Sequence, residues 1–512
     1  MPHSISKTIL LGILLAAVSC AESETYNNPV IRADIADPSI ILVGDTFYAT
    51  GSSFDWAPHF PVLQSDDLVN WKEVGQVFVQ KPEWTVSDFW APELLQRNGR
   101  FYCYYTSRRK SDGISFIGVS ISEKPEGPYL DHGPVVTLGT EAIDPFVIEV
   151  DGVPFITWKA YGLDRRPIEL LTAQLSDDGT ELVGEPFSLL RDDEGQGMEG
   201  QCLLHIGGWY YILYSAGDCC GPGSDYNVRI ARSHSYEGPY EKYSGNPILH
   251  GNGNIKSCGH GTAVTGKDGR MFYMCHAYLE GDGFYLGRVP ALFELAVTED
   301  GWLGVIGGPG APEKAECPYN HAKQVLPKAF VDDFDSEEIA RGWSWNDVFS
   351  DVRYALKDGD LLLSGSPVKQ GMYSGAVLAV RPSGTRYSVS TDMEFNESDS
   401  QGLTFYGDDR NFILWGNVHG LVTLMLFEEE VPSILYSDQY SGHEINLSAE
   451  IHDGDKACFS WTGEDGVRHD CPVKDVDLRK LTRWDRTFRP GLITSCSHEQ
   501  PGIFHNFRYE NK

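Results

Sequence analysis

The residues of this chain that could carry acid–base chemistry recur at one place in a repeated pattern. Each stands at the start of an apolar strand, which a short turn joins to a second strand rich in aromatic residues. These residues are Asp37, Glu93, Asp144, Glu199 and His260. Two carboxylates on opposite sides of a pocket can cleave a glycosidic bond, because one protonates the leaving oxygen while the other activates a water. A separation of about 6.5 to 9.5 Å leaves room for that water and inverts the anomeric centre.

The repeated strand pairs predict how these residues are brought together. The first pair covers residues 40–43 and 46–50, with Gly44-Asp45 as its turn. Four more copies follow at a period of roughly 50 to 60 residues, which predicts an all-β fold with a five-bladed β-propeller over residues 25–309. The innermost strand of each blade runs along the axis, so the polar residues would converge there. A third carboxylate at that place would raise the pKa of the acid by like-charge repulsion. The alternative is that these residues only cap turns.

Composition narrows the classes of ligand. The chain has 512 residues, a formal net charge of −32, and 12% aromatic residues. Nucleic acids and anionic membranes attract clustered Lys and Arg, so the charge argues against both as partners. Neutral ligands such as sugars remain open, because aromatic side chains suit their apolar faces as well as β-sheet cores.

Residues 1–24 read as a targeting segment and are excluded from the fold. Lys7 supplies a positive start, and residues 9–18 form an apolar stretch too short to span a bilayer. The run 17–20, Ala-Val-Ser-Cys, is similar to a bacterial lipobox, with Cys20 as the lipidated residue. We therefore expect an exported protein, held to the cell envelope at the periplasm or cell surface by this lipid alone. Ordinary signal-peptidase cleavage nearby is the alternative.

The chain changes character after the repeats. Residues 310–329 read as a linker that continues the Gly/Pro-rich run starting at Gly307. Evenly spaced short strands over 330–512 then predict a two-sheet, jelly-roll-like β-sandwich. Ten cysteines remain besides Cys20, and disulfides can form in an exported chain. The adjacent Cys219-Cys220 pair follows the inner strands of the fourth blade, where a vicinal disulfide would stiffen a pocket edge.

With these motifs the chain resembles glycoside hydrolase family 43, the five-bladed propeller hydrolases that act on arabinose- and xylose-containing polysaccharides. The matching runs are Asp37-Pro38-Ser39, Trp90-Ala91-Pro92-Glu93, Ile143-Asp144-Pro145-Phe146, Glu199-Gly200 and Gly259-His260-Gly261. The resemblance implies an inverting mechanism with Asp37 as general base and Glu199 as general acid. It also implies that Asp144 orients the acid and tunes its pKa. The region 330–512 resembles the concanavalin-like sandwich appended to many members, which serves either to close the active site or as a separate carbohydrate-binding module.

The resemblance extends to secondary residues. Arg288 fits an arginine that contacts the sugar in some members, and His260 fits an axial histidine near an ion bound through water. Trp90 and Phe54 are candidate stacking platforms for sugar rings, with rim packing as the alternative. Trp56 and Trp158 are further candidates for this role, and Asp34 is the rival to Asp37 as general base. Glu93 is a further candidate for the substrate pocket, although it could instead support the pocket wall or bond a neighbouring blade.

The resemblance implies an inverting exo-glycosidase that releases terminal pentose units from plant cell-wall polysaccharides or oligosaccharides. We favour an α-L-arabinofuranosidase over a β-xylosidase. A β-galactofuranosidase, an endo-arabinanase, and a non-catalytic surface glycan-binding propeller are the alternatives. No cofactor is required for this chemistry, and a structural calcium on the propeller axis is an additional expectation.

Overall fold

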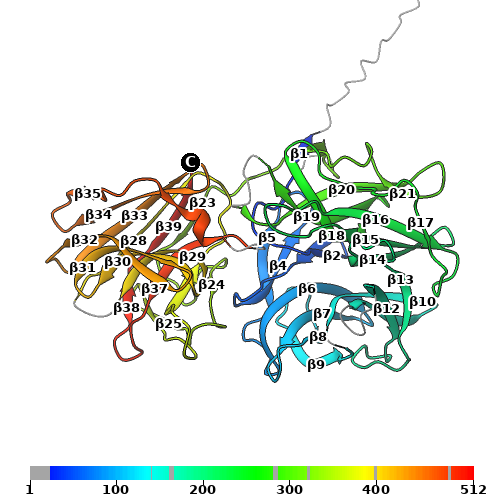
Figure 1. The fold of residues 1–512 in the computed structure, drawn as a ribbon, viewed down its shortest axis with the longest axis horizontal. Helices are drawn as coiled ribbons and strands as arrows, with labels where there is room; N and C mark the ends of the chain where they lie inside the picture. The colour runs from blue at the N-terminus through cyan, green and yellow to red at the C-terminus, as the bar shows by residue number, and fades with distance from the viewer. Residues whose placement is uncertain are drawn as a thin grey trace, which may run out of the picture.

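The computed structural model describes residues 24–139, 141–160, 167–280, 286–319, 323–396, 400–482 and 486–512. The targeting segment, apart from its last residue, lies outside these ranges, and so does Cys20. Within them the chain forms two β-rich bodies, a propeller and a sandwich, which lie side by side (Figure 1). No helix in the described part of the chain is long and apolar enough to cross a membrane.

The propeller consists of five four-stranded antiparallel sheets, each formed by four strands that are consecutive in the chain. The sheets are β2 (Ser39–Val43) to β5 (Lys72–Phe78), β6 (Thr85–Arg97) to β9 (Leu130–Val136), β10 (Ala142–Val150) to β13 (Phe187–Arg191), β14 (Glu199–Ile206) to β17 (Glu241–Lys242), and β18 (Ile255–Thr265) to β21 (Leu303–Val305). The middle strands are β3 (Thr46–Thr50), β4 (His59–Ser65), β7 (Arg100–Arg109), β8 (Ser115–Ser122), β11 (Val153–Ala160), β12 (Glu169–Gln174), β15 (Trp209–Ala216), β16 (Asn227–Ser233), β19 (Met271–Leu279) and β20 (Val289–Val297). The predicted five-bladed propeller is therefore confirmed.

The first strands of the five blades pack around one axis. β2 contacts β6, each further inner strand contacts the next, and β18 contacts β2, which closes the ring. The ends of the propeller are tied outside the blades, because β1 (Thr25–Asn27) pairs with β22 (Lys314–Glu316). The latter strand lies inside the segment 310–329, which the sequence predicts to be a linker without regular structure.

The sandwich has two antiparallel sheets that enclose a second core. The larger contains β23 (Ala329–Asp332), β25 (Arg353–Lys357), β26 (Asp360–Ser364), β28 (Tyr387–Glu394), β33 (Glu444–His452), β34 (Lys456–Gly463), β35 (Arg468–Asp470), β36 (Val476–Asp477), β38 (Gly502–Phe504) and β39 (Phe507–Asn511). The smaller contains β24 (Ser344–Trp345), β27 (Ala376–Ala379), β29 (Gln401–Asp408), β30 (Asn411–Val418), β31 (Leu421–Glu428), β32 (Val431–Gln439) and β37 (Arg489–Thr494). A 3₁₀ helix, η2 (Leu478–Leu481), follows β36.

The sandwich packs on the first blade through an apolar patch. Trp56 of the propeller is 5% exposed and lies in one buried cluster with residues of β27, β29, β30 and β37. The Arg489 guanidinium stacks 4.5 Å above its ring. The backbone of Ala57 forms a bridge with Trp345 of β24. Burial of aromatic surface on this scale makes the two bodies one packed unit, and it means that Trp56 is no sugar platform.

Candidate active site

The inner strands share a backbone kink at their axial ends. At this kink one residue of each blade has a positive φ: Asp37 (53°), Ala91 (44°), Asp144 (58°), Gly200 (57°) and His260 (46°). Four of these are not glycine, and such residues avoid this region unless the surrounding structure holds them there. The kinks define which positions are equivalent. Glu199 therefore stands one residue before the kink of its blade and Glu93 two residues after, so the register expected from sequence is wrong at these two acids.

The kinked amides are held by side chains. In four blades the acceptor comes from the preceding blade's second strand or the segment after it. The amide of Gly200 is bound by Asp144, which stands on the inner strand of the preceding blade. The pairs are Ala91 N to Ser52 Oγ (2.8 Å), Asp144 N to Thr106 Oγ1 (3.1 Å), Gly200 N to Asp144 Oδ2 (3.1 Å), His260 N to Ser215 Oγ (2.7 Å) and Asp37 N to His276 Nδ1 (3.2 Å). This ring of bonds fixes the direction of the side chains at the kinks, as a preorganised site requires.

Asp37 is surrounded by donors and cations. Ser52 Oγ donates to its Oδ2 at 2.5 Å, and a guanidinium nitrogen of Arg288 lies 3.3 Å from its Oδ1. The Nδ1 atoms of His260 and His276 lie 3.4 and 3.1 Å from the same Oδ1. Burial by itself raises the pKa of Asp37, but Arg288 and the two imidazoles outweigh it and hold that pKa well below its ordinary value. Asp37 is therefore a carboxylate that stays ionised.

The surroundings of Asp144 and Glu199 shift the pKa values of these two acids in opposite directions. Burial, opposed by His260 and reinforced by the charge of Glu199, raises the pKa of Asp144 to about 6. Glu199 accepts hydrogen bonds from Lys159 Nζ at 2.5 Å and Tyr226 Oη at 2.8 Å. Burial raises the pKa of Glu199, but the Lys159 ammonium and these two hydrogen bonds lower it by more. The two acids form a coupled pair in which Asp144 holds a proton more readily.

The side chain of Glu93 makes its hydrogen bond to a neighbouring blade and not to the other acids. It is 7% exposed, and its Oε2 accepts a hydrogen bond from Ser39 Oγ of the first blade at 2.8 Å. Burial raises its pKa to about 8, so the side chain is protonated at neutral pH. Both features favour the contact between neighbouring blades, which the sequence left open beside a role in the substrate pocket.

The two aromatic candidates differ in their exposure. Phe54 is 1% exposed, and its ring lies between the guanidinium groups of Arg288 (5.2 Å) and Arg486 (5.1 Å), the second of which belongs to the sandwich. Trp90 is partly exposed, with the Arg108 guanidinium 5.2 Å from its ring centre. Trp90 thus has a face that a sugar could reach, whereas Phe54 serves as packing for two cations.

His260 lies between the acids. Its Nδ1 is 3.4 Å from Asp37 and 3.8 Å from Asp144, and its ring approaches Gly200 so closely that a Cβ there would meet His260 at 2.6 Å. Position 200 therefore requires glycine both because its φ is positive and because a side chain would clash with His260. Calcium takes six to eight oxygen ligands, so an imidazole between two carboxylates does not fit direct coordination of that ion.

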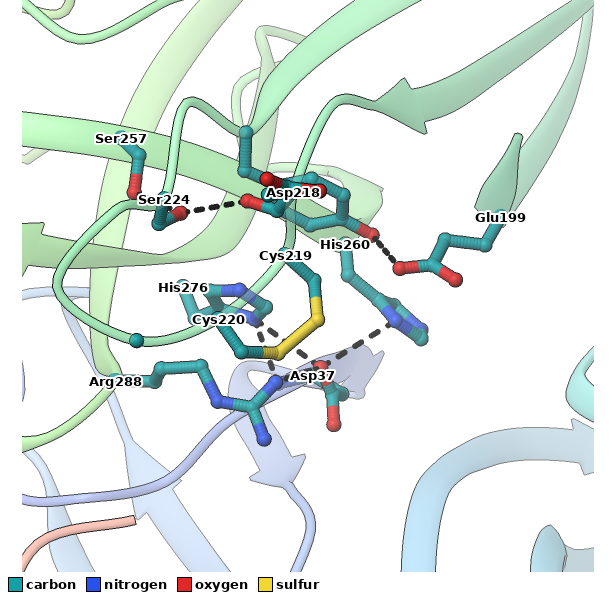
Figure 2. Close-up of a disulfide and its surroundings, with 12 residues drawn as sticks. Asp37, Glu199, Asp218, Cys219, Cys220, Ser224, Ser257, His260, His276 and Arg288 are labelled. Carbon is teal, nitrogen blue, oxygen red and sulfur yellow. Dashed lines mark hydrogen bonds and ion pairs between the residues drawn. A yellow bond between two sulfur atoms is a disulfide. The ribbon is translucent and has the colours of Figure 1, made fainter. Parts of the chain in front are cut away.

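A disulfide joins Cys219 and Cys220 in the loop between β15 and β16. Both ends of this loop reach the site, because Ser215 binds the amide of His260 and Tyr226 binds Glu199. Figure 2 shows the disulfide in the same close-up as Asp37, His276 and Arg288, with Glu199 directed into that space. The vicinal bond expected from the sequence is therefore present, on a loop anchored to the general-acid candidate.

The structure adds residues to the site that the sequence did not single out. They are Ser52, Lys159, Tyr226 and His276. A signal for two of them exists, since Lys159 and His276 are each the single basic residue of a largely apolar strand. Arg288, predicted to contact the sugar, lies beside Asp37, whereas Trp158, a weaker platform candidate, is wholly buried. Asp34, considered as a rival base, binds the backbone amide of Arg288 and so is structural.

A propeller whose axis gathers an ionised acid and a coupled pair of acids from three separate blades defines a glycoside hydrolase. Residues 26–303 match the model of glycosyl hydrolases family 43, and residues 331–482 match that of the beta xylosidase C-terminal concanavalin A-like domain. The chain belongs to glycosyl hydrolases family 43.

Relatives and solved structures agree with this assignment. A non-reducing end alpha-L-arabinofuranosidase of Bacteroides ovatus, BoGH43B, is 31% identical over 431 residues, which cover 79% of this chain and 77% of that protein. A beta-xylosidase of Bacillus subtilis is 26% identical and covers 75% of this chain and 78% of its own length. The crystal structure of the GH43 BlXynB protein from Bacillus licheniformis has a TM-score of 0.81 at 24% identity, with 96% of this chain and all of that chain covered, which supports the two-domain fold.

Proposed function

We propose that the protein is an inverting, exo-acting glycoside hydrolase that removes terminal pentose residues from plant cell-wall polysaccharides or oligosaccharides, with α-L-arabinofuranosyl groups preferred over β-D-xylosyl groups. The observation that carries the proposal is the opposite electrostatic state of the acids on the axis. Asp37 is held ionised, while the pKa of Asp144 is raised and that of its coupled partner Glu199 is lowered, so the pair holds its proton on Asp144. Inverting hydrolysis requires one carboxylate and one carboxylic acid at the same moment.

In this mechanism Asp37 is the general base. It accepts a proton from a water that attacks the anomeric carbon from the face opposite the leaving oxygen. Ser52 and Arg288 hold the carboxylate in place, and His276 stays neutral because burial lowers its pKa to about 4. Arg288 and the contacts with the two imidazoles together lower the pKa of Asp37, which keeps the carboxylate ready at acidic pH.

Glu199 is the general acid and gives its proton to the leaving oxygen. The contact with Lys159 opposes this role, because its ammonium stabilises the ionised form of Glu199. We infer that the proton of the coupled pair rests on Asp144 before substrate binds, and that a sugar hydroxyl draws Lys159 away from Glu199. The proton then moves to Glu199, whose charge no longer has a cationic partner, and from there to the leaving oxygen.

The choice of sugar and of exo action has separate support. The curated relatives named above are an alpha-L-arabinofuranosidase that acts at non-reducing ends and a beta-xylosidase, and the first is the more similar. The sandwich reaches the rim beside the site, where Arg486 pairs with Asp55 and stacks on Phe54. A second domain at this rim limits the room for a long chain on one side, which favours attack at chain ends over internal cleavage.

The test is hydrolysis by the mature protein of nitrophenyl α-L-arabinofuranoside, β-D-xyloside and β-D-galactofuranoside, beside linear arabinan. Release from the arabinofuranoside above the others, with loss in Glu199→Gln on oligosaccharides, is the expected result. Proton NMR of the first product formed gives the anomer and so tests inversion. Cleavage of arabinan alone would indicate an endo enzyme, and binding without turnover on all substrates would support a non-catalytic glycan-binding propeller.

We also propose that the protein is exported and attached to the cell envelope through a lipid on Cys20. The apolar leader and the run that ends at Cys20 support this, and two relatives are described as extracellular, an arabinofuranosidase of Cellvibrio japonicus and an arabinanase of Bacillus subtilis. Metabolic labelling with a radioactive fatty acid should mark the wild type and leave Cys20→Ala unlabelled. Equal labelling of both, or of neither, would contradict the proposal.

A further inference from the structure

Three side chains of different chemistry meet on the outer side of the larger sandwich sheet. His452 is the last residue of β33, Cys458 lies on the neighbouring strand β34, and Asp475 directly precedes β36, which also pairs with β34. His452 and Cys458 are diagonal neighbours across the antiparallel pair, a spacing that long side chains can bridge. One ligand atom from each of the three residues lies within 4.8 Å of the other two.

We propose that His452, Cys458 and Asp475 form a binding site for a zinc-like divalent ion, separate from the hydrolase site. Zinc bonds of about 2.0 to 2.1 Å to nitrogen, 2.0 to 2.2 Å to oxygen and 2.3 Å to sulfur, in a tetrahedron, place nitrogen and oxygen about 3.4 Å apart and sulfur and oxygen about 3.6 Å apart. The observed distances are 3.0 Å from His452 Nε2 to Asp475 Oδ1 and 3.7 Å from Cys458 Sγ to the same oxygen. The two distances to the Asp475 oxygen are therefore within about 0.4 Å of those that the ion requires, and the nitrogen and the sulfur lie within 4.8 Å of each other.

The donor set also selects the kind of ion. A thiolate and an imidazole prefer zinc, cobalt and related metals over calcium and magnesium, which take oxygen ligands. Asp475 and the Cys458 thiolate together balance the two charges of the ion. The nearby Lys456, which pairs with His452 across the strands, has its ammonium 4.0 Å from Asp477. Three protein ligands leave the fourth position of the tetrahedron to water.

The hydrogen bonds among the three residues show what an ion would replace. The carboxylate oxygen of Asp475 accepts from the thiol of Cys458 and from the imidazole of His452, so hydrogens occupy the space between the three ligand atoms. On binding, the Cys458 thiol loses its proton to solvent and the sulfur bonds to the metal. A neutral His452 presents the lone pair of Nε2 by carrying its ring proton on Nδ1. Binding thus releases one proton per ion, and affinity rises with pH.

The experiment is a titration of the mature protein, free of metal after chelation, with Co²⁺ as a spectroscopic probe and then with Zn²⁺. We expect a thiolate-to-cobalt charge-transfer band that Zn²⁺ abolishes at one equivalent, with one proton released. The band should be absent in Cys458→Ser. In Asp475→Asn the affinity for Co²⁺ should be at least tenfold weaker. His419→Gln, an exposed histidine on the other sheet, should behave as the wild type. Excess Zn²⁺ at 100 times its Kd should raise the melting temperature of the sandwich by about 5 to 10 °C.

Two results would overturn the proposal. One is a cobalt complex without the charge-transfer band, which would place the ion elsewhere, for example among the axial acids. The other is a band that survives in Cys458→Ser. Melting temperatures measured with a chelator present show whether each variant is folded, and the two ligand variants are judged separately. The site does not depend on the proposed hydrolase activity, so glycosidase assays neither support nor weaken it.

Discussion

The replacement Asp144→Asn tests the electrostatic account of the site most directly, because it should stabilise the protein while it impairs catalysis. Asp144 is buried, and its pKa is raised from 3.8 to about 6, first by desolvation and then by the charge of Glu199. Asparagine has nearly the same shape and tolerates the positive φ of this position. It can still accept the hydrogen bond from the amide of Gly200.

The magnitude follows from the pKa. Moving it from 3.8 in the unfolded chain to about 6 in the native state costs the ionised native protein about 3 kcal/mol at neutral pH. A raised pKa in an acid means that the native state binds the proton more tightly. The penalty is therefore fully present above pH 6, shrinks as pH falls from 6 to 4, and is absent below the unfolded pKa. Removal of the carboxylate should recover about 3 kcal/mol, because the pKa of about 6 already includes the opposing effect of His260.

The assay is thermal unfolding of wild type and variant at pH 7 and pH 4. We expect the variant to melt about 4 to 8 °C higher at pH 7, with the difference nearly gone at pH 4. Its kcat on arabino-oligosaccharides should fall by about 10²-fold, because the proton of the acid pair is no longer held. Asp151→Asn is the matched control, with the same substitution and a positive φ at an exposed turn of the same blade. An unchanged or lowered melting temperature at pH 7 would refute the assigned pKa.

Three further changes test other parts of the site. Glu199→Gln should lower kcat/KM on oligosaccharides by about 10²- to 10⁴-fold and spare activated aryl glycosides, whose leaving groups need less protonation. Lys159→Met breaks the same ion pair but keeps the proton donor, so it should retain the wild-type dependence of the rate on the leaving group. Equal losses in both variants would contradict the role of Glu199 as general acid. Arg288→Met should raise the pKa of Asp37 and so move the acidic limb of the kcat/KM profile to higher pH, and an unmoved limb would mean that the base is another group. Deletion of residues 330–512 should give an insoluble or inactive propeller because it uncovers the buried patch on the first blade, and a soluble, fully active product would show that the sandwich is an independent module.

The fold was largely predictable from the sequence, because a propeller repeats a local pattern. Each blade is formed by consecutive strands, so its hairpins and turns are visible in a short stretch of residues. The sandwich was predictable for the same reason. The packing of Trp56 against the sandwich was not, since an aromatic residue in a loop gives no sign of which distant surface will cover it.

The site was predictable in its acids and less so in their partners. Asp37, Asp144 and Glu199 stand next to recognisable turns, but the residues that set their ionisation come from other blades. His276 and Arg288 reach Asp37 from more than 200 positions away in the chain. The position of Glu93 relative to the kink was also predicted wrongly. The kink is defined by a positive φ, and the residues that adopt it in the five blades differ in type, so the sequence does not mark it.

This difference shows where the chemistry of the site resides. Asp37 and Asp144 have the same side chain, the same left-handed kink and nearly the same burial, yet their pKa values move in opposite directions. Burial cannot explain the divergence, because it raises both. Arg288 explains it, since its guanidinium touches Asp37, whereas Asp144 has the negative Glu199 as its coupled neighbour. The two roles are thus assigned by one arginine and one glutamate from different blades, and exchanging those neighbours should exchange the ionisation states of the two aspartates.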